Sequence, residues 1–355
     1  MKQSESTRNL LIKHCQQYPL LQIRDIFKFI YQSSFGCEHM VSSLENATDY
    51  IRKESQYCSE KNENLIDVLD GAYSRVHLSY LKRGLSTQTL GKLFFLSAKK
   101  EPNGKTETED KLNIAKELVC EGALPFSLCE FEKAVGEWQA VGYAAIHHSD
   151  TFRANYNPSY RVISNKYVPY LPVLERIDET LKKGSAIVAI EGGSASGKTT
   201  LSQMLGEIYD CTVFHMDDFF LRPEQRTAQR YAEVGGNVDR ERFLEEVLIP
   251  LSKNQSIDYK RFDCSTFELC EPIKVTPQKL TIIEGAYSMH PELAPYYDLS
   301  VFLDISPELQ RKRIAKRNSP QMAERFYNQW IPLEQTYFSK MQVRQRCHIS
   351  VLINE

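Results

Sequence analysis

The sequence lacks the cysteine and hydrophobic patterns of secreted and membrane proteins. Its nine cysteines are odd in number, scattered, and never spaced as C-x-x-C. This argues against a disulfide framework or a zinc ribbon and indicates a reducing compartment. Residues 1–17 contain no apolar core of a signal peptide, and no uncharged apolar run of about 18 residues occurs. We therefore expect a cytoplasmic protein with no membrane partner.

The chain also lacks an excess of either charge. Lys and Arg together number 44 and Asp and Glu number 46, which gives a formal net charge of −2. This balance favours no nucleic-acid partner, so any anion site must be local. With 355 residues, of which 42% are hydrophobic and 25% charged, the chain is long enough for two ordinary globular domains.

The first half of the chain has the periodicity of helices. Apolar residues recur at helical spacing at Leu20, Ile23, Ile26, Phe27 and Ile30. Similar patterns occur at 110–118 and 129–141, and turn-forming residues separate them. We expect a mainly helical domain over residues 1–180. A connecting helix is expected at 173–183, overlapping the end of this domain, and Gly184 ends that helix.

The second half alternates short apolar runs with helix-like segments. The runs are rich in Val, Ile and Phe and lie at 186–190, 212–216, 280–283, 299–303 and 349–353. Runs of this length that are apolar on both faces are typical of a parallel sheet covered by helices on both sides. Helical segments are predicted between them, for example at 240–251 and 307–317. We expect an α/β domain over residues 185–355.

A glycine-rich segment carries the strongest functional signal. Residues Gly192–Thr199 read G-G-S-A-S-G-K-T, a full match to G-x-x-x-x-G-K-[ST]. A turn that merely joins a strand to a helix is the alternative, but the strand before it and the amphipathic segment after it are what a phosphate-binding loop requires. We expect a nucleoside triphosphate to be bound by Gly192, Gly193, Ser194, Ala195, Ser196, Gly197, Lys198, Thr199 and Thr200.

Each part of this segment has a physical task. Glycines let main-chain N–H groups turn toward a polyphosphate, and the following helix adds the positive end of its dipole. Lys198 supplies a cation for the β- and γ-phosphates, and Thr199 offers a hydroxyl to Mg²⁺. The second half contains no N-K-x-D motif, which counts against a GTPase, and no hydrophobic run ending in D-E, which weakens a motor interpretation.

Two acids follow the second predicted strand. Because the carboxyl ends of parallel strands meet at the ligand, Asp217 and Asp218 are expected beside the phosphate loop. A carboxylate there can accept the proton of a substrate hydroxyl or hold a metal-bound water. Helix capping is the alternative role for this pair.

The C-terminal half resembles the uridine kinase, phosphoribulokinase and pantothenate kinase family of P-loop kinases. The segments that carry the resemblance are, in order, 192–199, 217–220, 237–243, 259–263, 282–285, and 302–304 followed by Arg313 and Arg317. The resemblance implies a P-loop NTPase fold, with a five-stranded parallel sheet, helices on both faces and a small lid. It also implies Mg²⁺-dependent transfer of the ATP γ-phosphoryl group to a hydroxyl of a small molecule.

The resemblance also assigns roles to individual residues. It makes Asp217 the candidate catalytic base beside Lys198, and it places Asp239 where uridine kinases hold sugar hydroxyls. Glu284 matches a glutamate that supports Mg²⁺ together with Thr199, although an ordinary strand-end acid is the alternative.

A basic helix and an arginine repeat complete the candidate site. Arg313 and Arg317 lie four residues apart and are expected to close over the transferring phosphoryl group, unless they belong to a solvated surface. Arg222 begins a repeat, with Arg226 and Arg230, that would share one face if the segment is helical. The repeat either binds an anionic acceptor, with Arg222 as the candidate, or forms a charged solvent face.

The acceptor is less well specified than the chemistry. Asp263 is a candidate acceptor ligand within the matching segment 259–263. Uridine kinases continue this segment with a His and an Arg near the base, whereas here Cys264, Ser265 and Thr266 follow. The resemblance therefore does not imply a pocket for a pyrimidine base.

The first half shows no resemblance to a family that we can name. A metal site formed by Glu38, His39 and His77 is one interpretation, but no H-x₃-H or H-E-x-x-H spacing supports it. An aromatic and basic run either binds an organic anion or fastens a loop to the domain surface: Arg153, Tyr156, Tyr160 and Arg161. Sensing of the acceptor, a second catalytic step and homo-oligomerisation are the tasks left open for this half.

We expect a cytoplasmic kinase that uses ATP and Mg²⁺ to phosphorylate a small molecule. Two other interpretations remain open. One is a nucleotide-gated regulatory binding module, which would not need the acids Asp217, Asp239 and Asp263. The other is a bifunctional enzyme with a second site in residues 1–180, which are too many to be a linker.

Overall fold

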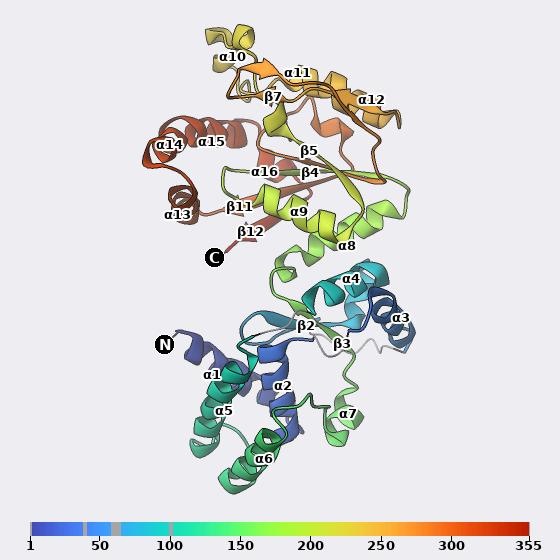
Figure 1. Ribbon diagram of the computed structural model, residues 1–355, viewed down its shortest axis with the longest axis vertical. Coiled ribbons are helices and arrows are strands. Elements are labelled where there is room, and N and C mark those ends of the chain that lie inside the picture. Colours follow the sequence, from blue (N-terminus) through green and yellow to red (C-terminus); the bar gives the residue numbers. More distant parts are fainter. Residues whose placement is uncertain (1, 38–40, 58–64, 99–101, 355) are drawn as a thin grey trace. The chain divides into compact units, whose positions relative to one another are not determined.

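The computed structural model describes residues 2–37, 41–57, 65–98 and 102–354. The chain divides into two compact units, Met1–Leu171 and Pro172–Glu355 (Figure 1). Each unit contains its own cluster of buried hydrophobic side chains. In the described part of the chain, no helix combines the length and the apolar character needed to cross a bilayer.

The first unit packs helices around a small antiparallel sheet. Its helices are α1 (Lys2–Gln17), α2 (Ile23–Phe35), α3 (Leu44–Ser55), α4 (Thr87–Ser97), α5 (Gly104–Cys120), α6 (Leu128–Ala140) and α7 (Asp150–Tyr156). The sheet has the order β1–β2–β3, with strands Ile66–Val68, Tyr73–His77 and Tyr160–Ser164. The helical character agrees with the prediction, but the sheet was not predicted. Every residue of β2 is buried, polar and charged ones included, so its sequence shows no alternation.

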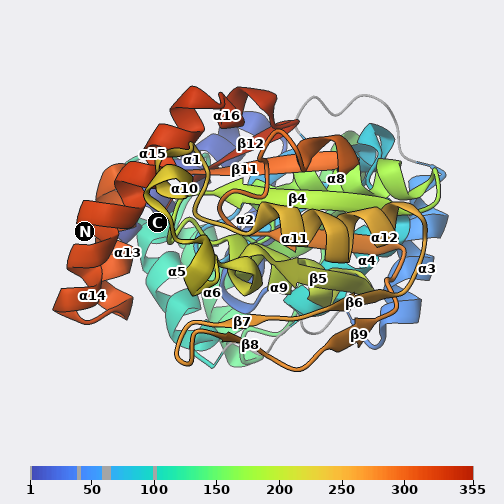
Figure 2. The ribbon, with the colours of Figure 1, turned by 90° about the horizontal axis from the view of Figure 1, so that it is seen from above.

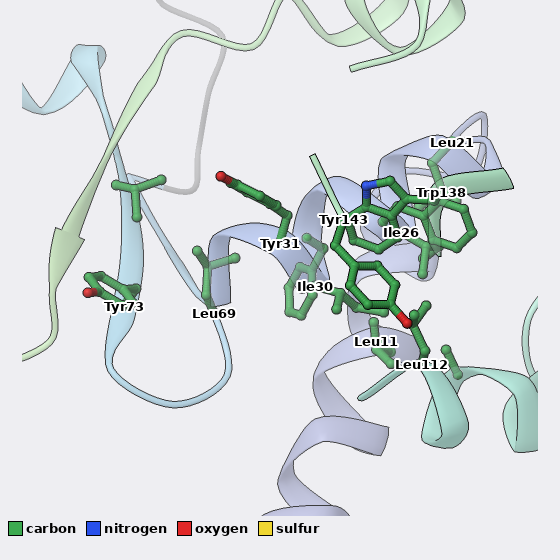
Figure 3. Close-up of a cluster of buried hydrophobic side chains, with 14 of the residues drawn as sticks. Leu11, Leu21, Ile26, Ile30, Tyr31, Leu69, Tyr73, Leu112, Trp138 and Tyr143 are labelled. Atoms are coloured by element: carbon green, nitrogen blue, oxygen red, sulfur yellow. The ribbon is translucent and has the colours of Figure 1, made fainter. Parts of the chain in front are cut away.

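Helix α2 runs through the core of the first unit. It begins where Asp25 Oδ2 accepts the N–H of Gln22 at 2.9 Å, which satisfies one of the donors at the helix start. The ring of Trp138 stacks on Phe27, with centroids 4.9 Å apart and an angle of 13° between the planes. Figure 3 shows Trp138 and Tyr143 beside Ile26 in this cluster. Helix α2 is buried on all sides from Asp25 to Ser34, so the predicted apolar periodicity marks only a part of its buried surface.

A chain of buried polar groups ties α2 to β3. His148 Nδ1 lies 2.8 Å from Asp25 Oδ1, and His148 Nε2 lies 2.6 Å from the Tyr160 hydroxyl. Ser149 also donates to Asp25, from its amide at 3.0 Å and its hydroxyl at 2.6 Å. Burial lowers the pKa of His148 to about 4. Burial opposes ionisation of Asp25 too, but its hydrogen bonds from His148 and Ser149 lower that pKa to about 2. A neutral His148 that donates to Asp25 and accepts from Tyr160 fits these contacts.

The run considered for an organic anion is engaged within its own unit. Arg161 Nη2 lies 2.7 Å from Glu54 Oε2, and Arg153 Nη2 pairs with Asp150 on α7. The Tyr156 hydroxyl accepts the N–H of Leu20 at 2.9 Å. These contacts favour the role of fastening a loop. Of the residues considered for a metal, His77 Nε2 lies 3.0 Å from Asp67 Oδ2, whereas Glu38 and His39 lie outside the described residues.

We expect the first unit to lose stability as the pH falls from about 7 to about 4.5. Unfolded His148 takes up a proton near pH 6.5, but folded His148 resists protonation until its pKa of about 4. The unfolded state thus binds more protons across this window, which costs on the order of 2–3 kcal/mol. In His148→Gln this contribution should be absent, while buried His14, whose pKa burial also lowers well below its usual value, keeps its own share of the loss.

The two tryptophans make this prediction measurable. Trp138 is buried in the first unit and Trp330 is 37% exposed in the second, so denaturant titrations of a Trp330→Phe background, followed by Trp138 fluorescence, report the first unit. His147→Gln, the same change at an exposed neighbour, is the control. Equal pH dependence in His148→Gln and the control would contradict the prediction.

The second unit is built on a five-stranded parallel sheet. Its strands are β4 (Ala186–Gly192), β5 (Cys211–His215), β10 (Leu280–Glu284), β11 (Leu299–Ile305) and β12 (Ile349–Ile353), in the order β12–β11–β4–β10–β5. All neighbouring pairs are parallel. The five strands coincide with the five predicted runs, to within two residues at each end. Register aligns Glu284 with Ile190 on one side and with His215 on the other, so the ends of β4, β10 and β5 meet.

Helices cover both faces of this sheet (Figures 1 and 2). Helices α8 (Leu171–Leu181) and α9 (Lys198–Ile208) lie on one face, where α9 contacts β4, β5 and β10. On the other face, Ala189, Phe214 and Ile283 pack with Phe243 and Val247, which follow the start of α11 (Arg240–Phe243). The fold class predicted from the sequence is confirmed.

Two helices of this unit contain a π-helical segment that ends two residues before a proline. The predicted helix 240–251 is α11, a π segment η6 (Leu244–Leu248) and α12 (Ile249–Ser252). The Ile249 N–H donates to Leu244 O, five residues back, and Pro250 follows. The same arrangement occurs where the π segment η8 (Phe326–Trp330) leads into α15 (Ile331–Lys340). There the Ile331 N–H donates to Phe326 O, and Pro332 follows. Proline clashes with the carbonyl four residues back, and the wider turn relieves that clash.

Shorter elements complete the second unit. A 3₁₀ turn, η4 (Met216–Phe219), follows β5, and α10 (Ala228–Ala232) precedes α11. Two small antiparallel pairs follow α12, namely β6 (Ile257–Tyr259) with β9 (Ile273–Val275) and β7 (Phe262–Asp263) with β8 (Glu268–Leu269). The last helices are α13 (Pro307–Arg317), α14 (Pro320–Arg325), α15 and α16 (Val343–Arg346).

Candidate active site

The predicted phosphate loop joins β4 to α9. Gly192 has a φ of +148°, and a Cβ there would lie 2.7 Å from Leu303 O on β11. Gly197, with a φ of +102°, turns the chain into α9, and a Cβ there would meet open space. Ala195 also adopts a left-handed conformation, with a φ of +61°. Left-handed angles of this kind allow a loop to direct main-chain N–H groups at an anion, as phosphate-binding loops do.

Lys198 lies over the loop. Its ammonium group donates to Gly192 O at 2.9 Å and to Gly193 O at 3.1 Å. Helix α13 contacts the same loop, because Gln310 Nε2 donates to Ser194 O at 2.8 Å and Arg313 Nη1 to Ala195 O at 3.3 Å. The predicted basic helix is thus placed at the phosphate loop rather than being only a solvated surface.

Thr199 and Glu284 meet at the start of α9. The Thr199 hydroxyl donates to Glu284 Oε1 at 3.1 Å, and His215 Nδ1 lies 2.6 Å from the same oxygen. Burial opposes ionisation of Glu284, but the hydrogen bond from His215 and the nearby Lys198 charge outweigh it and lower the pKa of Glu284. The same hydrogen bond raises the pKa of His215. A hydroxyl and a carboxylate held together in this way are a donor set that suits Mg²⁺.

Asp217 lies in η4, two residues beyond the end of β5. It reaches solvent, yet the loss of hydration around its carboxylate raises its pKa, and the Lys198 ammonium partly opposes that rise. Glu284, His215 and Arg317 are the other charged groups that act on it. Asp217 is therefore close to the loop lysine, the candidate metal residues and α13, as predicted for a residue at the carboxyl end of the sheet.

The Asp239 carboxylate is buried beside η4. It caps α11 by accepting the Arg242 N–H at 3.3 Å through Oδ1. Oδ2 lies 3.4 Å from Arg242 Nε and 3.7 Å from Arg222 Nε, but among the described residues no donor completes a hydrogen bond to it. A buried carboxylate oxygen with unused acceptor capacity suits a ligand hydroxyl. Arg242 also donates to the main-chain Asp218 O at 3.0 Å, which ties Asp239 to the turn that carries Asp217.

The structure bears on two further sequence interpretations. Asp263 Oδ1 accepts the N–H of Ser265 at 2.7 Å and its hydroxyl at 2.6 Å, so its carboxylate is engaged in the turn between β7 and β8. The arginine repeat does not form one helical face, because residues 222–230 are divided between η5 (Pro223–Gln225) and α10. Arg226 lies over the Phe267 ring at 5.0 Å, and Arg230 pairs with Glu241 at 2.6 Å.

The structure adds residues to the site that the sequence analysis did not select. His215 was counted only as a strand residue, although its place two residues before Asp217 was a usable signal. Glu191 is fully buried, and burial raises its pKa to about 7. It accepts the Gly192 N–H at 2.9 Å and the Tyr337 hydroxyl at 3.1 Å. Glu334 on α15 accepts the Ser194 N–H at 2.9 Å, and nothing in its local sequence marks it.

The residues at this site fit a nucleoside triphosphate with Mg²⁺. The Ser196 hydroxyl is buried without a partner among the described residues, and Thr199 and Thr200 are exposed at the start of α9. Over the described ranges, no group of three or more His, Cys, Asp or Glu side chains is placed to hold a metal ion. A metal at Thr199 and Glu284 would therefore need further oxygen ligands, and phosphate oxygens are the usual ones for Mg²⁺.

Residues 187–342 match the model of the Phosphoribulokinase / Uridine kinase family. The matched residues lie within the second unit. A uridine kinase-like protein 3 from Arabidopsis thaliana is 24% identical over 143 residues, which cover 38% of this chain and 30% of the relative. A phosphoribulokinase from Synechocystis sp. is 28% identical over 144 residues, which cover 39% of this chain and 42% of the relative.

The shared region is a part of each protein. The chain spans 30% and 42% of the length of these two curated relatives. A solved structure described as a possible uridine kinase from Bacillus stearothermophilus matches 51% of this chain and 99% of its own length, at 22% identity and a TM-score of 0.37. The family match covers the phosphate loop, Asp217, Asp239, Glu284 and the basic helix α13, and it leaves the first unit outside.

Proposed function

We propose that this chain is a kinase that transfers the γ-phosphoryl group of ATP to a hydroxyl of a small molecule. The observation that carries the proposal is the meeting of the phosphate loop and a carboxylate at the carboxyl edge of the parallel sheet. The charge of Lys198 acts directly on Asp217, and Arg317 on α13 acts on the same carboxylate. A regulatory module that only senses nucleotide would not need this acid.

The residues divide the chemistry as follows. Asp217 accepts the proton of the acceptor hydroxyl while the acceptor oxygen forms its bond to the γ-phosphorus. The bond between that phosphorus and the β,γ-bridging oxygen breaks, and the leaving diphosphate keeps the electron pair. Lys198 and the loop amides stabilise the charge that develops, and Arg313 and Arg317 add cations from α13. When bound at Thr199 and Glu284, Mg²⁺ would neutralise phosphate charge.

The acceptor side suits a small polyhydroxyl compound. The unused Oδ2 of Asp239 can accept a ligand hydroxyl, and Arg222, whose side chain is 39% exposed, lies beside it and can pair with an anionic group. Asp263 accepts the Ser265 hydroxyl through Oδ1. Cys264, Ser265 and Thr266 follow it, where uridine kinases have a His and an Arg near the base. The proposal therefore names a hydroxyl acceptor and no particular base or sugar.

A two-step screen tests the proposal. Thermal unfolding of the full chain is recorded with Mg²⁺ and a non-hydrolysable ATP analogue, alone and with a panel of nucleosides, sugars, sugar phosphates and vitamins. A compound that binds the folded state raises the midpoint by mass action. Each hit is then incubated with Mg²⁺ and ATP, and release of ADP with matching phosphorylated product is expected. Stabilisation by nucleotide without turnover of any hit would favour the regulatory module.

A further inference from the structure

Helix α15 sends a buried carboxylate into the phosphate loop. Glu334 is 4% exposed, and its Oε1 accepts the Ser194 hydroxyl at 2.6 Å while Oε2 accepts the Ser194 N–H. One turn later, the Tyr337 hydroxyl donates to Glu191, the residue before the loop. Helix α15 is therefore fastened to the loop at two points, and a negative charge occupies one of the main-chain donors of the loop.

The charged groups of the proposed active site act on Glu334. Burial raises its pKa, and the Lys198 ammonium and the two Ser194 donors oppose that rise. The charge of Asp217, the proposed base, also acts on it. A phosphoryl group in transfer must lie between the loop lysine and the base, because its phosphorus is attacked from the side of the acceptor. The region that the terminal phosphate enters is thus already bordered by a carboxylate.

The two anions compete for the same donors. A polyphosphate binds loop amides and the loop lysine. Glu334 already accepts the Ser194 N–H, and the charge of Lys198 stabilises its carboxylate. Like charges close together in a partly buried site repel strongly. The β-phosphate is expected nearer the start of α9, at the positive end of the helix dipole, so its conflict with Glu334 is smaller.

We propose that Glu334 is a specificity-determining residue that competes with the terminal phosphate of a nucleoside triphosphate. The inference rests on the proposed function, since it assumes that the loop holds the nucleotide. A triphosphate must displace Glu334 from Ser194, whereas a diphosphate leaves the contact in place. Glu334 therefore lowers the affinity for the triphosphate more than the affinity for the diphosphate, so the two affinities become more similar. As a result, a triphosphate that has not reacted dissociates more readily from the loop.

Calorimetric titration of two nucleotides tests this inference. Glu334→Gln keeps the side-chain length and an acceptor oxygen for Ser194 but removes the charge. At pH 8 with Mg²⁺, we expect this variant to bind the β,γ-imido analogue of ATP about tenfold more tightly than the unmodified chain, a change of about 1.4 kcal/mol. We expect its affinity for ADP to stay within about twofold. Glu324→Gln, the same change at an exposed acid on α14, should alter neither affinity.

The opposite results are informative. A purely structural Glu334 would give a lower thermal midpoint together with unchanged or weaker binding of the ATP analogue in Glu334→Gln, and this result would overturn the inference. Equal tightening of ADP and the analogue would also overturn it, because the competitor would not be the terminal phosphate. If the unmodified chain binds neither nucleotide, the proposed function itself fails and the inference fails with it.

Discussion

Replacement of Lys198 by methionine is expected to abolish phosphoryl transfer while the second unit stays folded. The ammonium group donates to two loop carbonyls and its charge acts on Asp217, Glu284, Glu191 and Glu334. Methionine keeps the aliphatic length of the side chain but removes the charge that a polyphosphate and the transition state need.

The expected loss in kcat is at least about 10³-fold, the upper range for removal of one group that stabilises transition-state charge. ADP release with the acceptor found in the screen measures it, and circular dichroism and the thermal midpoint verify the fold. Lys183→Ala, at an exposed position after α8, is the control. Activity in Lys198→Met within tenfold of the unmodified chain would show that the loop does not hold the transferring group.

Replacement of Asp217 by asparagine has the second largest expected effect. Asparagine is isosteric but cannot accept the hydroxyl proton, so kcat should fall by about 10²- to 10⁴-fold, the usual contribution of a general base. Nucleotide affinity should change little, because Asp217 is assigned to the acceptor side. Single-turnover measurements separate the chemical step from product release.

The pH profile gives an independent test of the same assignment. Asp217 acts as a base only when ionised, and its pKa is raised because its carboxylate loses hydration. We therefore expect kcat/KM to fall as the pH drops through a value above the ordinary range of an aspartate, and we expect that limb to vanish in Asp217→Asn. Asp218→Asn is the matched control one residue away. A larger loss in Asp218→Asn than in Asp217→Asn would move the base assignment to Asp218.

The second unit was predictable from the sequence because its signals are local. A strand buried on both faces is a continuous apolar run, so all five strands of the sheet were visible, as were the loop Gly192–Thr199 and the strand-end acid Asp217. The expected meeting of Asp217 with the loop follows from a general property of parallel sheets. That meeting needed no knowledge of individual side-chain contacts.

What the sequence did not show depends on contacts between distant segments. Glu334 and Ser194 are 140 residues apart, and no periodicity relates them. Asp263 was selected from a family segment, but the serine two residues later takes its carboxylate through a local turn. Strand β2 carries Arg75 and His77 in a buried layer, so the apolar signal of a strand is missing. Long-range pairing and local hydrogen bonding decide these three cases.

The wide turn before Pro332 fixes which way α15 points. Each residue of an α-helix adds roughly 100° of rotation, so a segment with one residue more or fewer turns everything that follows. Glu334 and Tyr337 lie in the first two turns of α15 after η8; Glu334 binds Ser194 in the loop, and Tyr337 binds Glu191 just before it. Deleting one residue from 326–330 would swing this pair toward another side without altering either amino acid. In this chain the length of the π-helical segment η8 thus determines whether Glu334 points at the phosphate loop. An insertion or deletion in η8 would change nucleotide selection without any substitution at the site.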